Sequence, residues 1–514
     1  MRTPAPLAHN FITVGVWTLA SRILGFVRDI VLAALLGAGP VAEAFLIAFS
    51  LPNMFRRIFA EGAFNTAFVP IFSKKLESGE GAAEFASEAF ATLSAFLILF
   101  TLLAQLVMPV LVVAMASGFL GDSRFELAVI YGRIAFPYIL FISLAALLSG
   151  VLNSTGRFAA AAAAPTLLNV AFIGALTGAH LAEIDPGLTL VWTVPIAGVG
   201  QFALVWIAAA RAGFLIRLRL PSLSPEMRRL AVIAAPAALA GGVVQVNLLI
   251  GRQVASVFEG AVAWLNYADR LYQLPLGVVG IAIGIVLLPD LSRKLESGDA
   301  AGARAGYSRA AETALALAVP AALALAVIPL PIISILFERG QFTHADAQAT
   351  AAALAIYAVG LPAFVLQKVV QPLFFARHDT RTPFNCAVAA LAINAVVAVG
   401  LASQMGFLAS ALGATIAGWS MLILLWSQAR KFGEAAMPDA GFRRTLPKIL
   451  LSALIMGGCL WLFSELTYES VAASPVRFVW LAGLVSGGIA IHGGLLHLTG
   501  AVSMAEIRRA LRRN

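Results

Sequence analysis

The sequence predicts an all-α polytopic membrane protein with about fourteen transmembrane helices; composition, loop charge and an internal repeat support this class. Of the 514 residues, 60% are hydrophobic and 12% are charged, and the mean hydropathy is +0.90. A soluble domain carries about 25% charged residues, so this chain has too few charges to keep its apolar side chains in water. The net charge of +9 does not indicate nucleic-acid binding, because the basic residues lie in short loops between apolar segments.

Apolar segments long enough to span a membrane, at about 20 residues each, define the predicted helices. The first segment is not a cleavable signal, because its apolar run is longer than a signal and contains arginines. In order, the segments cover approximately residues 11–37, 43–72, 84–116, 126–152, 158–180, 188–211, 230–257, 261–291, 305–337, 346–375, 384–403, 406–429, 446–465 and 476–499.

Lysine and arginine gather in every second loop, which is the pattern that orients helices in a membrane. With the N-terminus inside, the outer loops hold only Arg124, Arg339 and Arg477. The inner loops hold most of the basic residues, among them Lys74, Lys75, Arg157, Arg211, Arg293, Lys294, Arg430 and Lys431. The bias persists along the chain and predicts that both termini are cytoplasmic.

An internal repeat divides the chain into similar parts. PIFSKKLESGE, from Pro70, recurs 219 residues later as PDLSRKLESGD, from Pro289, and a second echo aligns Asn169 with Asn394. An even number of segments separates the copies, which predicts two six-helix lobes of the same orientation with a substrate site between them. The predicted parts are an N-lobe (1–212), a cytoplasmic amphipathic linker (213–229), a C-lobe (230–430), and two extra helices with a basic tail (431–514).

Charged residues lie inside the first predicted span, although each charge at that depth costs about 2.5–3.5 kcal/mol on insertion scales. Arg22 and Asp29 are seven residues apart and therefore lie on nearly the same helix face. Ser21 and Arg28 have the same spacing and lie on the neighbouring face. An intramembrane charge is by default a functional hypothesis, so these four residues are candidate site residues.

Two further spans carry buried charges. In the second, Arg57 and Glu61 are four residues apart and can form a structural pair, whereas Arg56 points away from that face. The eighth contains Asp269 and Arg270. Arginines outnumber acids in these three spans, which predicts a water-filled cavity between the lobes with an excess of positive charge.

The arginine excess favours a di-anionic ligand such as a diphosphate. A planar guanidinium binds phosphate through two parallel hydrogen bonds, and the same positive field repels cationic drugs. The six histidines have no metal-ligand spacing, and no phosphate-cradling glycine loop or nucleophile elbow is found. The residues therefore predict a transporter without a metal or another cofactor, and not an enzyme.

Long motifs in the first two segments resemble the bacterial lipid II flippase family, also called the MurJ or MviN family. They are SRILGFVRDIVLAALLGAGPVAEAF and LPNMFRRIFAEGAFNTAFVPIFS; YADRLYQLPLGVVGIAIGIVLLPDLS and FERGQFTHADAQATAAALAIYAVGLP extend the likeness over nearly the whole chain. The family belongs to the multidrug/oligosaccharidyl-lipid/polysaccharide exporter superfamily. The resemblance implies two six-helix lobes and an extra C-terminal pair that forms a groove for a lipid tail.

The resemblance also implies the substrate: undecaprenyl-diphosphate carrying the disaccharide-pentapeptide of peptidoglycan, moved from the inner to the outer leaflet. By this likeness Arg22, Arg28, Arg56 and Arg270 bind the diphosphate. Ser21, Asp29, Glu61 and Asp269 are their polar companions. Glu43 stands where the family usually has an aspartate, and it is placed with Arg57, Glu61 and Asp269 as support for the cavity or its gate.

Some relatives bind sodium through an acid in the seventh helix, but this chain has Asn247 and Arg252 there. Membrane voltage is therefore the expected driving force, at about 2.3 kcal/mol per charge for 100 mV. Membrane lipids and the cell-wall synthesis machinery are the further partners that the likeness suggests.

Other functions stay open at this point. The alternatives are an exporter of another polyprenyl-diphosphate oligosaccharide, a drug/cation antiporter of the same fold, a scaffold for wall synthesis, and an enzyme acting on lipid carriers. An antiporter of cations would need acid in the cavity, and an enzyme would need an acid/base pair or metal ligands in the loops.

Overall fold

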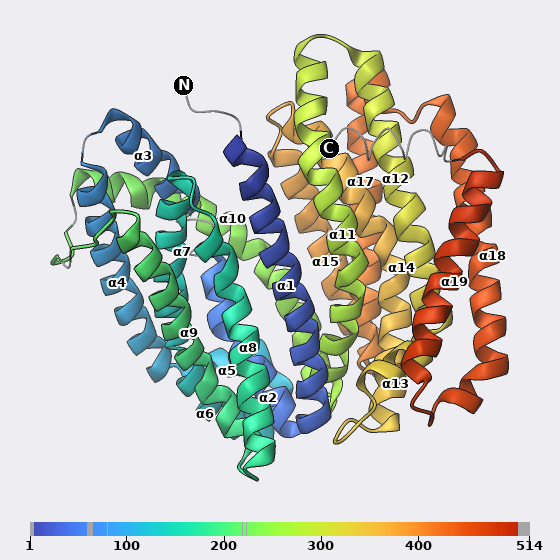
Figure 1. The fold of residues 1–514 in the computed structure, drawn as a ribbon, viewed down its shortest axis with the longest axis horizontal. Helices are drawn as coiled ribbons and strands as arrows, with labels where there is room; N and C mark the ends of the chain where they lie inside the picture. The colour runs from blue at the N-terminus through green and yellow to red at the C-terminus, as the bar shows by residue number, and fades with distance from the viewer. Residues whose placement is uncertain (1–4, 59–64, 80, 218, 223, 502–514) are drawn as a thin grey trace. The chain divides into compact units, whose positions relative to one another are not determined.

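The structure is a computed structural model that describes residues 5–58, 65–79, 81–217, 219–222 and 224–501 (Figure 1). Within these ranges it contains helices and loops, and the only β-type contact is an isolated bridge between Arg339 and Phe342. The predicted all-α class is therefore confirmed. The contacts divide the chain into two compact units, which are described separately.

Each predicted apolar segment coincides with one helix or with two consecutive helices. In the described part of the chain, nine helices are long and apolar enough to cross a membrane, or ten if one bent pair is counted as a span. This count covers only the described residues of the chain. The multi-pass character is confirmed, and the exact number of spans stays a prediction.

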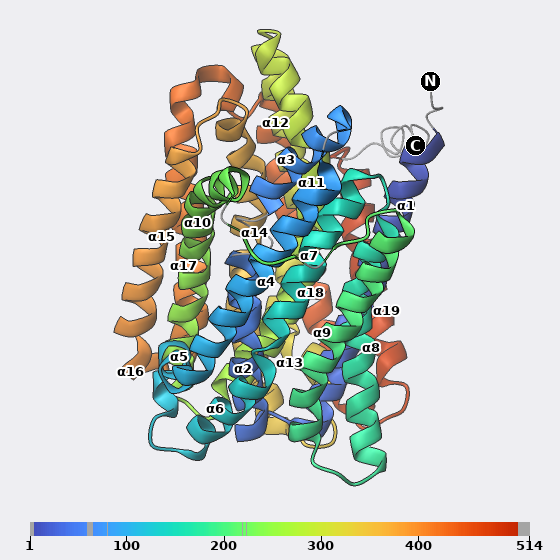
Figure 2. The same cartoon turned by 90° about the vertical axis from the view of Figure 1, so that its left-hand side faces the viewer.

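Unit 1 comprises residues 1–263 and 339–342. Within it α1 packs against α8, α8 and α7 pack against α9, and α2 packs against α6. Helices α4 and α7 lie side by side in both Figure 1 and Figure 2. The described helices of this unit are α1 (Ala5–Leu36), α2 (Pro40–Arg56), α3 (Asn65–Ser78), α4 (Ala82–Leu106), α5 (Met108–Met115), η2 (Ser117–Phe119), α6 (Ser123–Ala135), α7 (Tyr138–Ser154), α8 (Ala159–Leu181), α9 (Pro186–Arg211) and α10 (Pro225–Ser256).

Two spans of unit 1 are broken at sites that their sequences explain. Helix α2 contains Pro52, ends at Arg56, and is followed by a π-helical turn at residues 57–58. Proline removes one backbone donor and frees a carbonyl in the preceding turn, which loosens the helix there. Helices α6 and α7 are bent by 40° about the break at Phe136 and Pro137.

The predicted linker at 213–229 has no helix before Pro225 in its described residues. It runs along α4, where the Arg217 backbone N–H donates to the Ser87 hydroxyl at 3.1 Å and the Thr92 hydroxyl donates to the Ser222 carbonyl at 3.3 Å. The α10 helix that follows also belongs to unit 1. The functional division into two lobes stays a prediction.

Unit 2 comprises residues 264–338 and 343–514. Its helix α14 packs against α12, α13 and α17, and α15 packs against α17. The described helices are the continuation of α11 (Ala261–Glu296), then α12 (Ala300–Val327), α13 (Pro329–Phe337), α14 (His344–Phe375), α15 (Arg381–Gly400), α16 (Ala402–Met405), α17 (Leu408–Ala429), η3 (Arg430–Ala436), α18 (Ala440–Val471) and α19 (Arg477–Leu498).

The extra C-terminal pair, α18 and α19, is anchored on α12. The buried side chain of His492 on α19 lies 3.1 Å from the Ser452 hydroxyl on α18 and 3.0 Å from the Ala316 carbonyl on α12. The carbonyl can only accept, so the Nε2 atom of His492 carries a proton. Leu315, Ile449 and neighbouring apolar side chains pack around this contact, which fixes the pair to unit 2.

Candidate functional site

A cavity of about 540 Å³ lies within unit 1, and it is the candidate functional site. Its size falls in the range of about 300–1,000 Å³ that is typical of small-molecule sites. Arg22 and Arg56 both line it. The described lining residues are Val14, Thr18, Ser21, Arg22, Arg56, Ile142, Ala145, Ala146, Ser149, Gly150, Asn153, Phe158, Ala161, Ala162, Ala164 and Pro165, and none of them is an acid.

Helical spacing explains how α1 presents its polar residues to the cavity. Val14, Thr18, Ser21 and Arg22 are separated by four, three and one residues, so they occupy one face of α1. Arg56 is the last residue of α2, directly before the π-helical turn. Such turns are frequent at functional sites. Two guanidinium groups from different helices therefore face the same volume.

Arg28 lies beside this cavity in a buried network, and it is held by its neighbour. Its Nε and Nη2 atoms donate to the Oδ1 atom of Asp29 at 3.0 and 2.7 Å. Its Nη1 atom donates to the Oδ1 atom of Asn169 on α8 at 3.0 Å. Arg28 and Asp29 expose only 9% and 4% of their surface. The pair is therefore desolvated, and its geometry is fixed from two helices.

Asn169 also connects this network to the cavity wall. Its Nδ2 group donates to the Ser21 carbonyl at 2.9 Å and lies 3.5 Å from the Ser21 hydroxyl. A Cβ atom at Gly25 would lie 3.5 Å from the Asn169 amide, which is ordinary van der Waals contact, so the amide packs closely against α1. Asn169 was not predicted as a site residue. The only signal for it was its alignment with Asn394 in the internal repeat.

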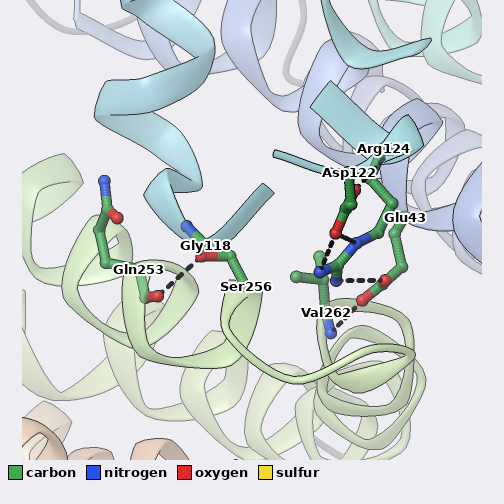
Figure 3. A network of polar contacts seen from close by, with 7 residues as sticks. All are labelled: Glu43, Gly118, Asp122, Arg124, Gln253, Ser256 and Val262. Carbon is green, nitrogen blue, oxygen red and sulfur yellow. Dashed lines mark hydrogen bonds and ion pairs between the residues drawn. The ribbon is translucent and has the colours of Figure 1, made fainter. Parts of the chain in front are cut away.

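Glu43 lies outside the cavity, in the first turn of α2, and it is fully buried. One carboxylate oxygen accepts from Arg124 Nη1 at 3.0 Å, and the other accepts from the Val262 N–H at 2.9 Å (Figure 3). Arg124 also donates from Nη2 to Asp122 at 2.6 Å, and its guanidinium lies 4.5 Å from the centroid of the Phe119 ring. Glu43 thus joins α2 to α6 and to the start of α11.

A second part of the same network ties the end of α10 to the η2 segment. The Gln253 side chain accepts from the Ser117 N–H at 2.9 Å and donates to the Val113 carbonyl at 2.9 Å. The Gly118 N–H donates to the Ser256 hydroxyl at 3.0 Å (Figure 3). A side chain at Gly118 would collide with the backbone of residues 256–257. These contacts explain why α10 belongs to unit 1. These contacts could not be predicted from the sequence, because neutral polar residues do not indicate their distant partners.

The remaining predicted residues lie elsewhere. Arg57 is exposed, and Glu61 lies outside the described residues, as does the predicted pair between them. Asp269 and Arg270 are half-buried on α11 in unit 2, and the Asp269 carboxylate accepts from Gln273. In the described part of the chain, no group of His, Cys, Asp or Glu side chains could hold a metal ion.

The fold and the cavity define a class: a multi-helix membrane transporter with a cationic cavity, built like the exporters of the multidrug/oligosaccharidyl-lipid/polysaccharide superfamily. A solved multidrug transporter of that superfamily in an inward-facing conformation matches with a TM-score of 0.69 and 13% identity, over 83% of this chain and 98% of that chain. A solved lipid II flippase MurJ in an inward closed conformation matches with a TM-score of 0.80 and 23% identity, over 95% and 98%.

The family model of the lipid II flippase MurJ matches residues 32–480, and the chain belongs to this family. A probable lipid II flippase MurJ of Rhizobium meliloti is 43% identical over 99% of this chain and 96% of its own length. The lipid II flippase MurJ of Burkholderia cenocepacia is 34% identical over 96% and 98%. The resemblance seen in the sequence motifs is therefore confirmed.

Proposed function

We propose that this chain moves lipid II across the bacterial inner membrane, and that the cavity of unit 1 receives the diphosphate of this lipid. Membership of the lipid II flippase family gives the transported lipid. The observation that supports the binding site is the pair of guanidinium groups, Arg22 and Arg56, that line one cavity whose described lining residues include no acid. The protein acts as a transporter: no covalent bond of the lipid changes.

The chemistry of the cavity matches that ligand. Each guanidinium can donate two parallel hydrogen bonds to a phosphate, so two of them satisfy the oxygens of a diphosphate from different directions. Ser21 adds a hydroxyl on the same wall. The absence of an acid among the described lining residues disfavours a cationic drug, which needs a carboxylate partner.

In this proposal Arg28 and Arg270 join Arg22 and Arg56 in an arginine clamp around the diphosphate. Arg28 lies in unit 1 and Arg270 in unit 2, so they reach the anion in different ways. Arg28 is already positioned by Asp29 and Asn169, so it can contact the anion with little loss of side-chain entropy. Arg270 belongs to the second unit and is proposed to reach the diphosphate as the protein alternates between inward and outward access. Both termini are proposed to lie in the cytoplasm, and voltage is proposed to drive the charged headgroup outward.

The test replaces Arg22 and Arg56 singly by alanine in a strain depleted of its own flippase. We expect failure to grow and accumulation of lipid II in the inner leaflet, at normal amounts of protein in the membrane. Each lost charged hydrogen-bond pair should weaken binding of undecaprenyl diphosphate by about tenfold or more. Arg133→Ala is the matched control, because Arg133 is an exposed arginine of α6 that does not line the cavity.

Arginine-to-lysine variants separate geometry from charge. Lysine keeps the charge but loses the planar fork, so Arg56→Lys should fail if two parallel hydrogen bonds are needed. Normal growth and normal lipid II distribution in both Arg22→Ala and Arg56→Ala would overturn the proposed site.

A further inference from the structure

The wall of the cavity on α7 differs in chemistry from the wall that carries the arginines. Ser149 and Asn153 are four residues apart and line the cavity from one face of α7, and Phe158 lines it from the turn that follows. Ala145, Ala146 and Gly150 occupy the same face, so bulky side chains do not fill the space in front of the polar groups. This wall is neutral, polar and partly aromatic.

The turn between α7 and α8 brings Asn153 and Phe158 to one side of the cavity. The Arg157 N–H donates to the Leu152 carbonyl at 2.9 Å and the Gly156 N–H donates to the Asn153 carbonyl at 3.0 Å. Gly156 has a φ of +76°, which closes the helix in the manner of a Schellman turn. The chain reverses over these residues, so Phe158 returns to the cavity that Asn153 lines.

The volume of the cavity exceeds the need of a diphosphate. At about 30 Å³ for each water-sized group, the cavity takes roughly 18 such groups, which is about twice the non-hydrogen atoms of a diphosphate. A ligand that fills the cavity therefore extends from the arginines toward the α7 wall, and the group that fits this wall is uncharged, polar at its edge and apolar on one face.

A pyranose has this chemistry. Its hydroxyl or acetamido groups can pair with the Asn153 amide, which both donates and accepts. The Ser149 hydroxyl donates to the Ala145 carbonyl at 2.8 Å, so its oxygen is oriented to accept from a ligand. The Phe158 ring offers an apolar face to the C–H face of the sugar, as aromatic side chains with a polar neighbour do in ligand pockets.

We propose that Ser149, Asn153 and Phe158 form a subsite for the sugar that is directly attached to the diphosphate. The inference rests on the proposed function, because the arginine wall fixes which part of the ligand reaches α7. The subsite distinguishes a sugar-bearing carrier lipid from the bare carrier diphosphate. It therefore lets the protein load lipid II in preference to undecaprenyl diphosphate.

The test compares two lipids on purified full-length protein: undecaprenyl diphosphate, and the same carrier with its disaccharide-pentapeptide. The measured quantity is the ratio of the two dissociation constants. We expect Asn153→Leu and Phe158→Leu each to lower the preference for the sugar-bearing lipid by about tenfold, with unchanged binding of the bare diphosphate. Trp192→Ala, which removes an exposed aromatic side chain of α9 outside the cavity, should leave the ratio unchanged.

The outcomes separate this inference from the proposed function. An unchanged ratio in both α7-wall variants would overturn the subsite, as would equal weakening of both lipids, since the residues would then serve the diphosphate or the fold. Arg56→Ala should weaken both lipids alike. If it weakens neither while Asn153→Leu lowers the ratio, the arginine clamp fails and the sugar subsite stands.

Discussion

Replacing Arg28 by alanine should destabilise the protein by about 3–5 kcal/mol, because it leaves the Asp29 carboxylate buried without the guanidinium that faces it. Asp29 is 4% exposed and accepts two hydrogen bonds from Arg28, at 3.0 and 2.7 Å, on a single oxygen. Asn169 loses a donor at 3.0 Å in the same change. A loss of this size is a large part of the roughly 5–15 kcal/mol that stabilises a typical domain.

Removing both charges should recover most of that stability. In Arg28→Leu/Asp29→Leu no charge is buried, and apolar replacement of a buried ion pair is often neutral. The double variant should therefore accumulate in the membrane close to the wild-type amount. It should still fail to transport, because the binding site has lost one guanidinium group that contacts the substrate.

Thermal unfolding in detergent, protein amount in membranes and growth of a depleted strain measure the three effects on the same set of variants. Equal unfolding temperatures for wild type and Arg28→Ala would refute the claim that Asp29 is desolvated. Normal growth of the double variant would refute the role of Arg28 in binding and leave it as a structural partner of Asp29.

Three further predictions concern other polar contacts of the two units. Asn169→Leu should lower transport more than protein amount, because it removes the acceptor that positions Arg28; equal losses in immunoblot and growth assays would argue for a purely structural role. Arg124→Ala should lower the free energy of unfolding by about 3–5 kcal/mol, because Glu43 is fully buried beside Arg124, and the loss should appear as a lower unfolding temperature in detergent. The double variant Arg124→Ala/Glu43→Gln should recover part of this loss. Lys431 and neighbouring hydrogen bonds lower the pKa of Asp379 from 3.8 to about 2. The contribution of Asp379 to stability is therefore complete above pH 4 and disappears as the pH falls toward 2. In acid unfolding of the purified protein, wild type should lose more stability than Asp379→Asn over that range.

The fold could be predicted largely from the sequence because hydropathy and helix length are local properties. All predicted segments coincide with helices, and prolines mark several of the breaks, such as the one before Tyr138. The grouping of α10 with unit 1 could not be predicted. It depends on Gln253 and Ser256 meeting backbone groups near Gly118, and a neutral side chain does not reveal a distant partner in the sequence.

Ser21, Arg22 and Arg56 were predicted as site residues, and all three line the cavity of unit 1. The predicted site between the two lobes stays a prediction, and the contacts of Arg28 could not be predicted from the sequence. Spacing along α1 placed Asp29 on the face of Arg22, since residues seven apart share a face and adjacent residues do not. In the structure Arg28 reaches the carboxylate of its immediate neighbour, and Asn169 from α8 holds its other side. A long flexible arginine side chain can bridge the angle between adjacent residues on a helix. Its conformation here is fixed by Asn169 on α8, which is remote from Arg28 in sequence.

The structure therefore distinguishes two ways of keeping arginine within a membrane. The charge of Arg28 is neutralised by the ion pair with Asp29, which fixes its position but also competes with an anionic ligand for the guanidinium. Arg22 and Arg56 instead line a cavity whose described lining residues include no acid, and we propose that the anion binds there. An anion that enters this cavity meets both guanidinium groups on its wall, whereas at Arg28 it has to compete with Asp29. For this reason Arg22 and Arg56 should dominate affinity for the diphosphate, and Arg28 should contribute orientation more than binding strength.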